Sequence, residues 1–292
     1  MEPVSIVIPA YNEEHGLGPV LTALLADMAQ AGGPFEVIVV DDGSKDDTAV
    51  IAAQYPVIAL RHQVNKGYGA ALKTGIRQAQ YDIICITDAD GTYPNGRIPQ
   101  LVNLLTNEGY DMVVGARIGA NVQIPLVRRP AKWALGRVAA YVANEPIPDL
   151  NSGLRVFRRE VVMRFFNILP NQFSFTTTIT LAMLTNQYRV LYVPIDYFAR
   201  VGQSKIRPIH DTINFMQLVL RIGLYFAPLK LFLPLSLWLL ILGIAWGTLT
   251  LLVTGQIADI STLVIVMTSF QVFVIGLLAE LINRRMPNDY RE

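Results

Sequence analysis

The sequence has little of what several common kinds of site require. It contains one cysteine, Cys85, so no disulfide framework can form within the chain. Its three histidines, His15, His62 and His210, lie far apart and lack the spacing of zinc ligands. Cys85 lies in an apolar run, and we expect it to be a small buried strand residue. These absences argue against a disulfide scaffold and a zinc site, and they fit a catalytic portion in the cytosol.

Charge is also scarce. Charged residues make up 16% of the chain, whereas about a quarter is usual in soluble domains. The formal net charge is +1, and because nucleic-acid binders usually carry a strong basic excess, no nucleic-acid partner is expected. The first residues lack the charged leader of a signal peptide, so none is expected there. Hydrophobic residues instead make up 52% of the chain, and they are not spread evenly.

The apolar excess gathers near the C-terminus. Residues 229–253 and 260–282 form two runs, each longer than the about 20 residues that a spanning helix needs. The connector 254–259 holds no Lys or Arg, whereas basic residues flank the outer ends of both runs. The positive-inside rule therefore predicts an integral protein of the cell membrane with two spans, and with its catalytic domain and both termini in the cytosol. The alternative is a buried helical hairpin of a soluble core.

A different helix is expected just before the first span, at residues 209–226. Polar residues recur there at spacings of three and four, and apolar residues fill the other side. This pattern predicts an amphipathic helix in contact with membrane lipids at the interface, or a helix packed on the globular domain, and both can hold at once. The expected organisation is a catalytic domain (1–206), an interfacial helix region (207–227), a two-helix transmembrane domain (228–283) and a cytosolic tail (284–292).

The first two hundred residues alternate two other patterns. Strands are expected at 4–8, 35–40, 57–60 and 82–86, and helices at 18–30, 46–54 and 68–80. Apolar strands that alternate with helices predict an α/β domain whose mostly parallel sheet is covered on both faces. Three of the strands are followed by polar clusters, at 9–14, 41–44 and 88–90. Because ligands bind beyond the carboxyl ends of such strands, these clusters predict one site.

The residues of this site suit phosphate chemistry. Asp88 and Asp90 follow a buried strand, and paired hard oxygen ligands there suit Mg²⁺ or Mn²⁺. Such an ion neutralises a leaving diphosphate as a Lewis acid. Guanidinium forks and ammonium groups suit phosphate oxygens. The candidate cations are Lys66, Arg117, Arg128, Arg129, Arg155, Arg200 and Lys205.

The acceptor is expected to be a lipid phosphate. Arg200 and Lys205 fall shortly before the membrane helices, at the level where a lipid phosphate would be presented. A phosphate monoester has its second pKa near 6 and is mostly dianionic at pH 7, so it can attack a sugar carbon without a strong base. The protein then mainly positions two anionic groups and screens their repulsion. If a carboxylate does assist, Asp149 is the candidate.

At this point the motifs resemble a known family. Val7-Ile-Pro-Ala-Tyr-Asn-Glu-Glu14, Val39-Val-Asp-Asp-Gly-Ser44 and Asp88-Ala-Asp90 together are similar to the family 2 inverting glycosyltransferases, which have a Rossmann-like GT-A fold. Asp149-Leu-Asn-Ser-Gly-Leu-Arg155 and Arg200-Val-Gly-Gln-Ser-Lys205, with Gly115-Ala-Arg117, resemble the polyprenyl-phosphate branch. The resemblance implies transfer of a sugar, with inversion, from a nucleotide sugar to undecaprenyl or dolichyl phosphate.

The resemblance also implies roles for single residues. Those expected to bind the nucleotide are Pro9, Tyr11, Glu13, Asp41, Lys66 and Asp88. Those expected to bind the acceptor or its phosphate are Arg117, Arg129, Ser152, Arg155, Arg200, Ser204 and Lys205. The residues expected to act in catalysis are Asp90, Asp149 and Arg117. Many members read Asp-x-Asp-Leu-Gln, with the Gln on the metal, whereas this chain reads Asp88-Ala-Asp-Gly-Thr92. Either the Thr92 hydroxyl joins Asp88 and Asp90 on the metal, or a water takes that place.

Three other functions are alternatives to this one. A processive polysaccharide synthase of the membrane usually carries a Gln-x-x-Arg-Trp motif and more spans, which this sequence lacks. A non-catalytic scaffold that binds nucleotide sugars would not need both the acidic pair and the basic set. A nucleotidyltransferase would carry a Gly-rich phosphate loop after the first strand. For the nucleotide of the donor, UDP is favoured over GDP, and the sugar is left open. Family resemblance favours a homo-oligomer, in particular a tetramer.

Overall fold

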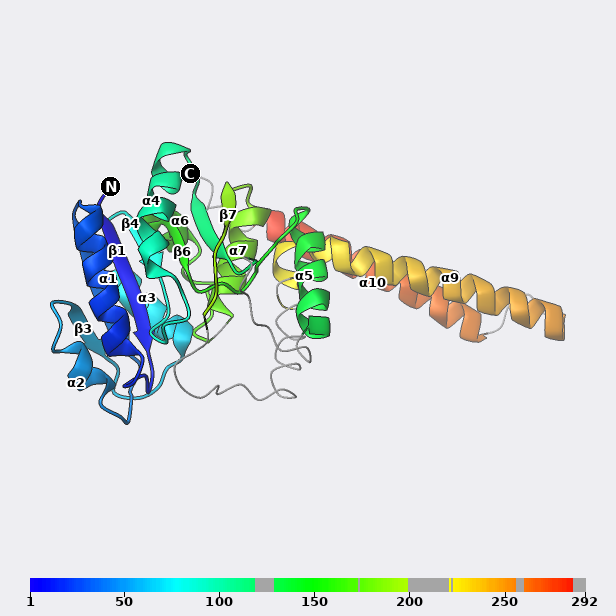
Figure 1. Cartoon of the computed structure of the whole chain (residues 1–292). Helices are drawn as coiled ribbons and strands as arrows, with labels where there is room; N and C mark the ends of the chain where they lie inside the picture. The colour runs from blue at the N-terminus through cyan, green and yellow to red at the C-terminus, as the bar shows by residue number, and fades with distance from the viewer. Residues whose placement is uncertain (119–128, 173, 199–220, 222, 256–259, 286–292) are drawn as a thin grey trace. The chain divides into compact units, whose positions relative to one another are not determined.

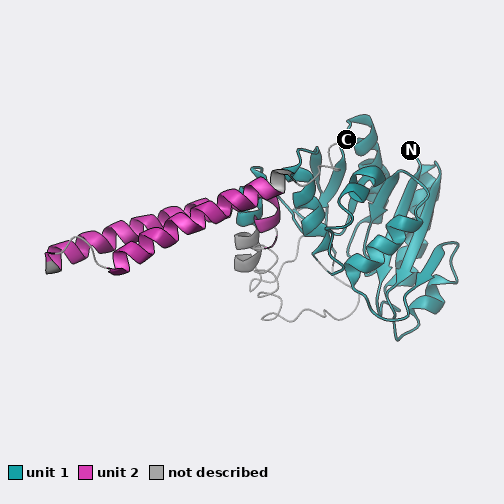
Figure 2. Cartoon of the chain, turned by 180° about the vertical axis from the view of Figure 1, so that it is seen from behind, with its two compact units in different colours: residues 1–213 teal, residues 214–292 magenta. Residues whose placement is uncertain are grey.

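The computed structural model describes residues 1–118, 129–172, 174–198, 221, 223–255 and 260–285. The chain divides into two compact units, residues 1–213 and 214–292 (Figure 2). The elements of the described ranges are, in chain order, β1 (Val4–Ala10), α1 (Leu17–Ala31), β2 (Phe35–Asp41), α2 (Thr48–Ala52), β3 (Ile58–Arg61), α3 (Tyr68–Gln78), β4 (Ile83–Ile86), η1 (Asn95–Arg97), α4 (Ile98–Asn107), β5 (Met112–Ala116), α5 (Arg129–Ala143), β6 (Arg155–Arg158), α6 (Arg159–Arg164), α7 (Phe175–Thr185), β7 (Val190–Pro194), α9 (Pro228–Thr254) and α10 (Ile260–Arg285).

The strands of the first unit form one sheet in the order β3-β2-β1-β4-β6-β5-β7 (Figure 1). β1 pairs in parallel with β2 and β4, and β5 pairs in parallel with β7, so the predicted α/β, mostly parallel sheet is confirmed. β6 runs antiparallel between β4 and β5, with Arg155 opposite Ile86. Because β6 begins where β4 ends, the segment before Arg155 lies at the same edge as the ends of β1, β2 and β4.

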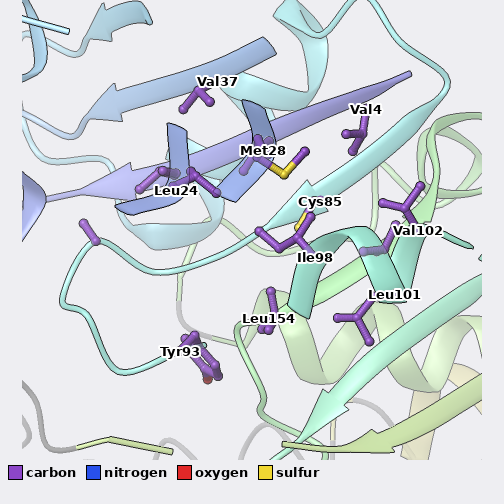
Figure 3. Close-up of a cluster of buried hydrophobic side chains, with 14 of the residues drawn as sticks. Val4, Leu24, Met28, Val37, Cys85, Tyr93, Ile98, Leu101, Val102 and Leu154 are labelled. Atoms are coloured by element: carbon purple, nitrogen blue, oxygen red, sulfur yellow. The ribbon is translucent and has the colours of Figure 1, made fainter. Parts of the chain in front are cut away.

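Helices cover both faces of the sheet. Ile6 of β1 belongs to the same buried cluster as Leu24 of α1, and Figure 3 shows the Leu24 side chain within that cluster. Val7, the next residue, faces α3, and a Cβ at Gly75 of that helix would collide with its side chain. Successive residues of β1 are therefore buried on opposite faces, which explains why the strand reads as a continuous apolar run. Cys85 is fully buried in β4, as predicted.

Most element boundaries differ from the expected ones by one or two residues, and two of these differences have a clear physical reason. The first strand is expected to end at residue 8, before Pro9, but β1 continues to Ala10. Only Val4–Val7 pair with β4, so at Pro9 the strand β1 is paired with β2 alone. On the side of β4 the missing N–H of proline therefore costs no hydrogen bond of the sheet. α2 begins at Thr48 and not at 46, because Asp46 Oδ1 instead accepts hydrogen bonds from the Thr48 amide (3.1 Å) and hydroxyl (2.5 Å).

The second unit contains two helices long and apolar enough to cross a membrane, Pro228–Val253 and Ile260–Ile282. At about 1.5 Å per residue, 26 residues extend about 39 Å, which exceeds the about 30 Å hydrocarbon core of a bilayer. The helices contact one another, and the Ser269 hydroxyl donates a buried hydrogen bond of 2.9 Å to the Ser236 carbonyl. Most outward side chains are apolar and exposed, with Leu252 at 84%. Such a surface fits a hydrocarbon surrounding and a membrane-associated protein.

The finer division of the chain stays a prediction. Most of the expected interfacial helix falls on residues 199–220 and 222, which lie outside the described residues. The expected boundaries at 206, 227 and 283 are likewise not tested by the division into two units.

Candidate active site

The loops that follow β1 and β2 are fastened to one another. The Asn12 amide donates to Ser44 Oγ at 2.9 Å, and the Lys45 amide donates back to Asn12 Oδ1 at 2.9 Å. The Glu13 amide donates to Thr48 Oγ1 at 2.8 Å. Asn12 has a φ of 52°, a left-handed conformation that Asn tolerates better than most residues. The two polar strand ends therefore form one fixed surface, and they carry the predicted nucleotide residues Pro9, Tyr11, Glu13 and Asp41.

Asp41 is buried at the end of β2. The Ser44 amide donates to its Oδ1 at 2.9 Å, and Arg61 Nε lies 3.1 Å from its Oδ2. The contact with Arg61 balances charge but lacks the geometry of a hydrogen bond, so Oδ2 has no hydrogen-bond donor among the described residues. A buried acceptor in this state suits a ligand N–H, such as that of a nucleotide base. The geometry is compatible with the predicted role of Asp41, which stays a prediction.

Asp42 and His62 were not singled out from the sequence. The Asp42 carboxylate accepts from the amides of Lys66 at 2.9 Å and Gly67 at 2.8 Å. His62 Nδ1 lies 2.6 Å from Asp42 Oδ1, and its Nε2 lies 2.9 Å from Thr74 Oγ1. Asp42 thus fixes the segment before α3 and leaves the Lys66 side chain exposed. In the sequence, Asp42 could have been recognised as the second Asp of the Asp-Asp pair at the end of β2.

The acidic pair follows β4. Asp90 is buried, and its Oδ1 accepts from the Thr92 amide at 3.2 Å and the Thr92 hydroxyl at 2.7 Å. The Tyr68 hydroxyl donates to Asp88 Oδ1 at 3.0 Å. Burial, and then the charge of Asp88, raise the pKa of Tyr68, so the phenol keeps its proton. Both carboxylates are therefore held in place by neighbouring hydroxyl groups.

The donor set determines what these carboxylates could bind. Among the described residues, no three side chains of His, Cys, Asp or Glu gather into one group. Two carboxylates at a strand end still suit Mg²⁺ or Mn²⁺, because such ions retain waters and also bind substrate phosphates. Thr92 is fully buried and its hydroxyl orients Asp90, while its predicted role as a metal ligand stays a prediction.

Arg117 and Asp149 form a tight ion pair. Arg117 Nε donates to Asp149 Oδ2 at 2.7 Å, and an Arg117 terminal nitrogen donates to Oδ1 at 2.9 Å. The side chain of Asp149 is 0% exposed and that of Arg117 is 17% exposed. Burial opposes the charge of Arg117, but the hydrogen bonds to Asp149, together with the nearby charges of Tyr93, Asp149 and Tyr197, outweigh it and raise the pKa of Arg117. Asp149 was expected to be the base if a carboxylate assists, yet here both of its oxygens are engaged by Arg117.

Ser152 and Arg155 support this region from beneath. Both are fully buried, and Ser152 Oγ donates to the Gly115 carbonyl at 2.5 Å. The Arg155 guanidinium donates to the Ser152 carbonyl, to the Thr176 carbonyl at 3.0 Å and to Thr180 Oγ1 at 2.9 Å. Burial lowers the pKa of Arg155. Both side chains lie below the surface, where they tie the 149–153 segment to β5 and α7, and their expected role in binding the acceptor stays a prediction.

Three segments that are distant in sequence meet at this edge of the sheet. Gly16 faces the Ala89 carbonyl so closely that an added Cβ would lie 2.7 Å from its oxygen. The Gly153 amide donates to the Tyr93 hydroxyl at 2.6 Å. The acidic pair thus lies between the loop after β1 and the segment before β6. The predicted residues Arg200, Ser204 and Lys205, and the candidate cation Arg128, lie outside the described residues, as does the side chain of Arg129.

Comparison with known proteins adds two family matches. Residues 5–166 match the model described as glycosyl transferase family 2. Residues 227–284, which include both long apolar helices, match the model described as GtrB C-terminal hairpin. The first match contains the acidic pair, the nucleotide-side loops and the Arg117–Asp149 pair.

Curated relatives share this part of the chain. A dolichyl-phosphate hexose transferase of Haloferax volcanii is 32% identical over 207 residues, covering 70% of this chain and 87% of that protein. An undecaprenyl-phosphate 4-deoxy-4-formamido-L-arabinose transferase of Pectobacterium carotovorum is 36% identical over 186 residues, covering 59% of this chain. The chain spans 56% of the length of that second relative.

Solved structures show the same fold. The glucosyl-3-phosphoglycerate synthase of Mycobacterium tuberculosis, in complex with Mn²⁺, UDP and phosphoglyceric acid, superposes with a TM-score of 0.59. It is 22% identical, and the match covers 75% of this chain and 78% of that one. At this level of identity the likeness concerns the fold alone.

Proposed function

The chain belongs to glycosyl transferase family 2, and we propose that it transfers a sugar from a nucleotide sugar, preferably a UDP-sugar, to a polyprenyl phosphate at the cytosolic face of the cell membrane. The observation that carries the proposal is that the site and the candidate membrane spans belong to one polypeptide chain. A single chain joins an acidic pair at a sheet edge to two helices that can cross a bilayer. A polyprenyl phosphate is anchored in lipid, so an enzyme that uses it has to work at a membrane.

The proposed reaction is a single displacement. A phosphate oxygen of the lipid attacks the anomeric carbon of the sugar, the bond from that carbon to the diphosphate oxygen breaks, and the nucleoside diphosphate leaves with the bonding electrons. The anomeric configuration inverts. No proton has to be removed from the attacking oxygen, because the phosphate monoester is mostly dianionic at pH 7. The protein's share is to bring two anionic groups together and to balance their charge.

The described residues divide this work. Asp88 and Asp90 would hold Mg²⁺ or Mn²⁺, which when bound supplies Lewis-acid neutralisation of the leaving diphosphate. Asp41 offers a buried acceptor for a base N–H. Arg117 carries a positive charge that Asp149 orients, and 17% of its side chain remains exposed. Its guanidinium carbon also lies 5.1 Å from the centre of the Tyr197 ring, which further restricts its position.

The membrane arrangement and assembly belong to the same proposal. The absence of Lys and Arg from the sequence 254–259, with Arg284 and Arg285 just after the second candidate span (Ile260–Ile282), supports a cytosolic catalytic domain with both termini on that side. The homo-oligomer expected from the family resemblance, a tetramer, is retained as part of the proposal. The processive synthase and the non-catalytic scaffold remain the alternatives that the next experiment separates.

A direct test uses the full-length protein in lipid nanodiscs containing undecaprenyl phosphate, with a panel of UDP- and GDP-sugars. We expect one lipid-linked monosaccharide and one nucleoside diphosphate per turnover, and a loss of about 100-fold or more when EDTA replaces Mn²⁺, because the leaving diphosphate then lacks its counter-charge. Product is followed by mass spectrometry of the lipid fraction. A growing saccharide chain would favour the processive synthase, and binding of nucleotide sugars without turnover would favour the scaffold.

Lys205 provides a test of the acceptor side. Replacing it by Ala should raise the KM for undecaprenyl phosphate about tenfold or more, since a charge-assisted hydrogen bond contributes about 1.5–3 kcal/mol. The affinity for the nucleotide sugar should stay unchanged. Arg97→Ala removes an exposed cation of η1 and serves as the matched control. Equal losses of donor and acceptor binding in Lys205→Ala would contradict an acceptor role.

A further inference from the structure

The Asp88 carboxylate lies between Tyr68 and Gly153. On one side the Tyr68 hydroxyl, at the start of α3, donates to Oδ1 at 3.0 Å. On the other side is Gly153, two residues before β6. A Cβ built on Gly153 would lie 2.7 Å from Asp88 Oδ2 and 3.0 Å from Oδ1. We call these three residues the Asp88 clamp.

Gly153 is glycine because of this contact and not because of its backbone. It is absent from the glycines with a positive φ, so an L-residue could adopt its conformation. The three nearest atoms that an added Cβ would meet all belong to the Asp88 carboxyl group. The Gly153 amide is fixed by its 2.6 Å hydrogen bond to the buried Tyr93 hydroxyl. Gly153 therefore presents a fixed surface against which the carboxylate rests.

Tyr68 is held just as firmly. The preceding Gly67 donates its amide to Asp42 Oδ2 at 2.8 Å, and Ala70 donates its amide to the Asn171 carbonyl at 3.0 Å. The first turn of α3 is thus attached to the end of β2 on one side and to the loop before α7 on the other. A phenol on so fixed a backbone can define where one oxygen of Asp88 lies.

We propose that Tyr68 and Gly153 are positioning residues that hold Asp88 in the orientation needed to bind the donor diphosphate with its divalent cation. This rests on the proposed function and adds to it the two groups that orient the first carboxylate of the pair. The clamp also joins the two halves of the site. Tyr68 is attached to the nucleotide side through Asp42, and Gly153 belongs to the segment that begins with Asp149.

The test uses purified full-length protein and measures the affinity for UDP in the presence of Mn²⁺ by calorimetry. Tyr68→Phe removes the hydroxyl and keeps the ring, and Gly153→Ala pushes the carboxylate aside. Each should weaken UDP–Mn²⁺ binding about tenfold, the effect of one hydrogen bond to a charged group. UDP affinity without metal should stay unchanged in both. Gly136→Ala is the matched control, because a Cβ at Gly136 meets nothing within 4 Å.

Stability separates positioning from a merely structural role. The Asp88 carboxylate is the movable end of a short side chain, so Gly153→Ala should lower Tm by no more than about 3 °C. Because both substitutions act through one carboxylate, their combined loss of affinity should be smaller than the product of the single losses. Should Gly153→Ala prevent folding, Tyr68→Phe alone decides the matter.

The outcomes are distinct. Variants that bind UDP–Mn²⁺ within about twofold of the parent protein would overturn the clamp and leave the proposed function standing. Fully multiplicative losses in the double variant would also count against a shared target. If the parent protein itself shows no binding of any nucleoside diphosphate with metal, the proposed function fails before the clamp is tested.

Discussion

Replacing Asp90 by Ala should abolish measurable sugar transfer while the protein still folds. Asp90 follows β4 and is 8% exposed, and its Oδ1 accepts hydrogen bonds from the amide and hydroxyl of Thr92. The hydrogen bonds from Thr92 thus help to orient the carboxylate within its own turn. Its loss should remove half of the charge that holds a divalent cation and cost at least about 10³-fold in kcat, as for other groups that stabilise developing charge.

Stability should change little in this variant. The Thr92 hydroxyl loses its acceptor, which costs about 1 kcal/mol, or about 2–4 °C in Tm for a domain of this size. Circular dichroism melts and the transfer assay are run on the same preparations. Asp82→Ala is the control, since Asp82 is an exposed aspartate at the opposite end of β4. Retained activity in Asp90→Ala, with the parent enzyme active, would remove Asp90 from the metal site.

Local patterns in the sequence predicted the elements that carry the site. The alternation of apolar strands and helices gave β1 to β4, and the polar residues that follow β1, β2 and β4 do lie at one edge of the sheet. This part succeeds because strand direction and strand-end chemistry are local properties. The predicted end of the first strand before Pro9 was wrong, because a proline is tolerated in a strand where the neighbouring strand has already ended. Here that neighbour is β4, and where β4 ends cannot be read from the residues of β1.

Contacts between distant segments could not be predicted in the same way. The hydrogen bond from Tyr68 to Asp88 spans 20 residues, and the Arg117–Asp149 pair spans 32. The burial of Arg155 has a similar origin. It begins β6, which runs antiparallel between β4 and β5, and nothing in its local pattern marks that reversal. The family resemblance identified the residues of this segment as important, but only the sheet topology shows which of them are buried supports.

Asp149→Asn gives the second large expected effect, and it separates two interpretations of that carboxylate. We expect activity to fall about 100-fold or more and the free energy of unfolding to fall by about 3 kcal/mol, because breaking one side of a buried ion pair leaves the other charge poorly compensated. The side chain of Asp149 is fully buried and makes two hydrogen bonds to Arg117 that are shorter than 3 Å. Glu160→Gln, an acid-to-amide change at an exposed position, is the control.

The double-mutant cycle with Arg117→Met distinguishes an orienting carboxylate from a base. If Asp149 acts by orienting Arg117, then once Arg117 is gone Asp149→Asn has nothing further to remove, and the double variant should be about as active as Arg117→Met alone. If Asp149 were a base that acts independently, the two losses in kcat would multiply. The dianionic acceptor does not need a base, and Arg117 already occupies both oxygens of this carboxylate, so we expect the non-additive result.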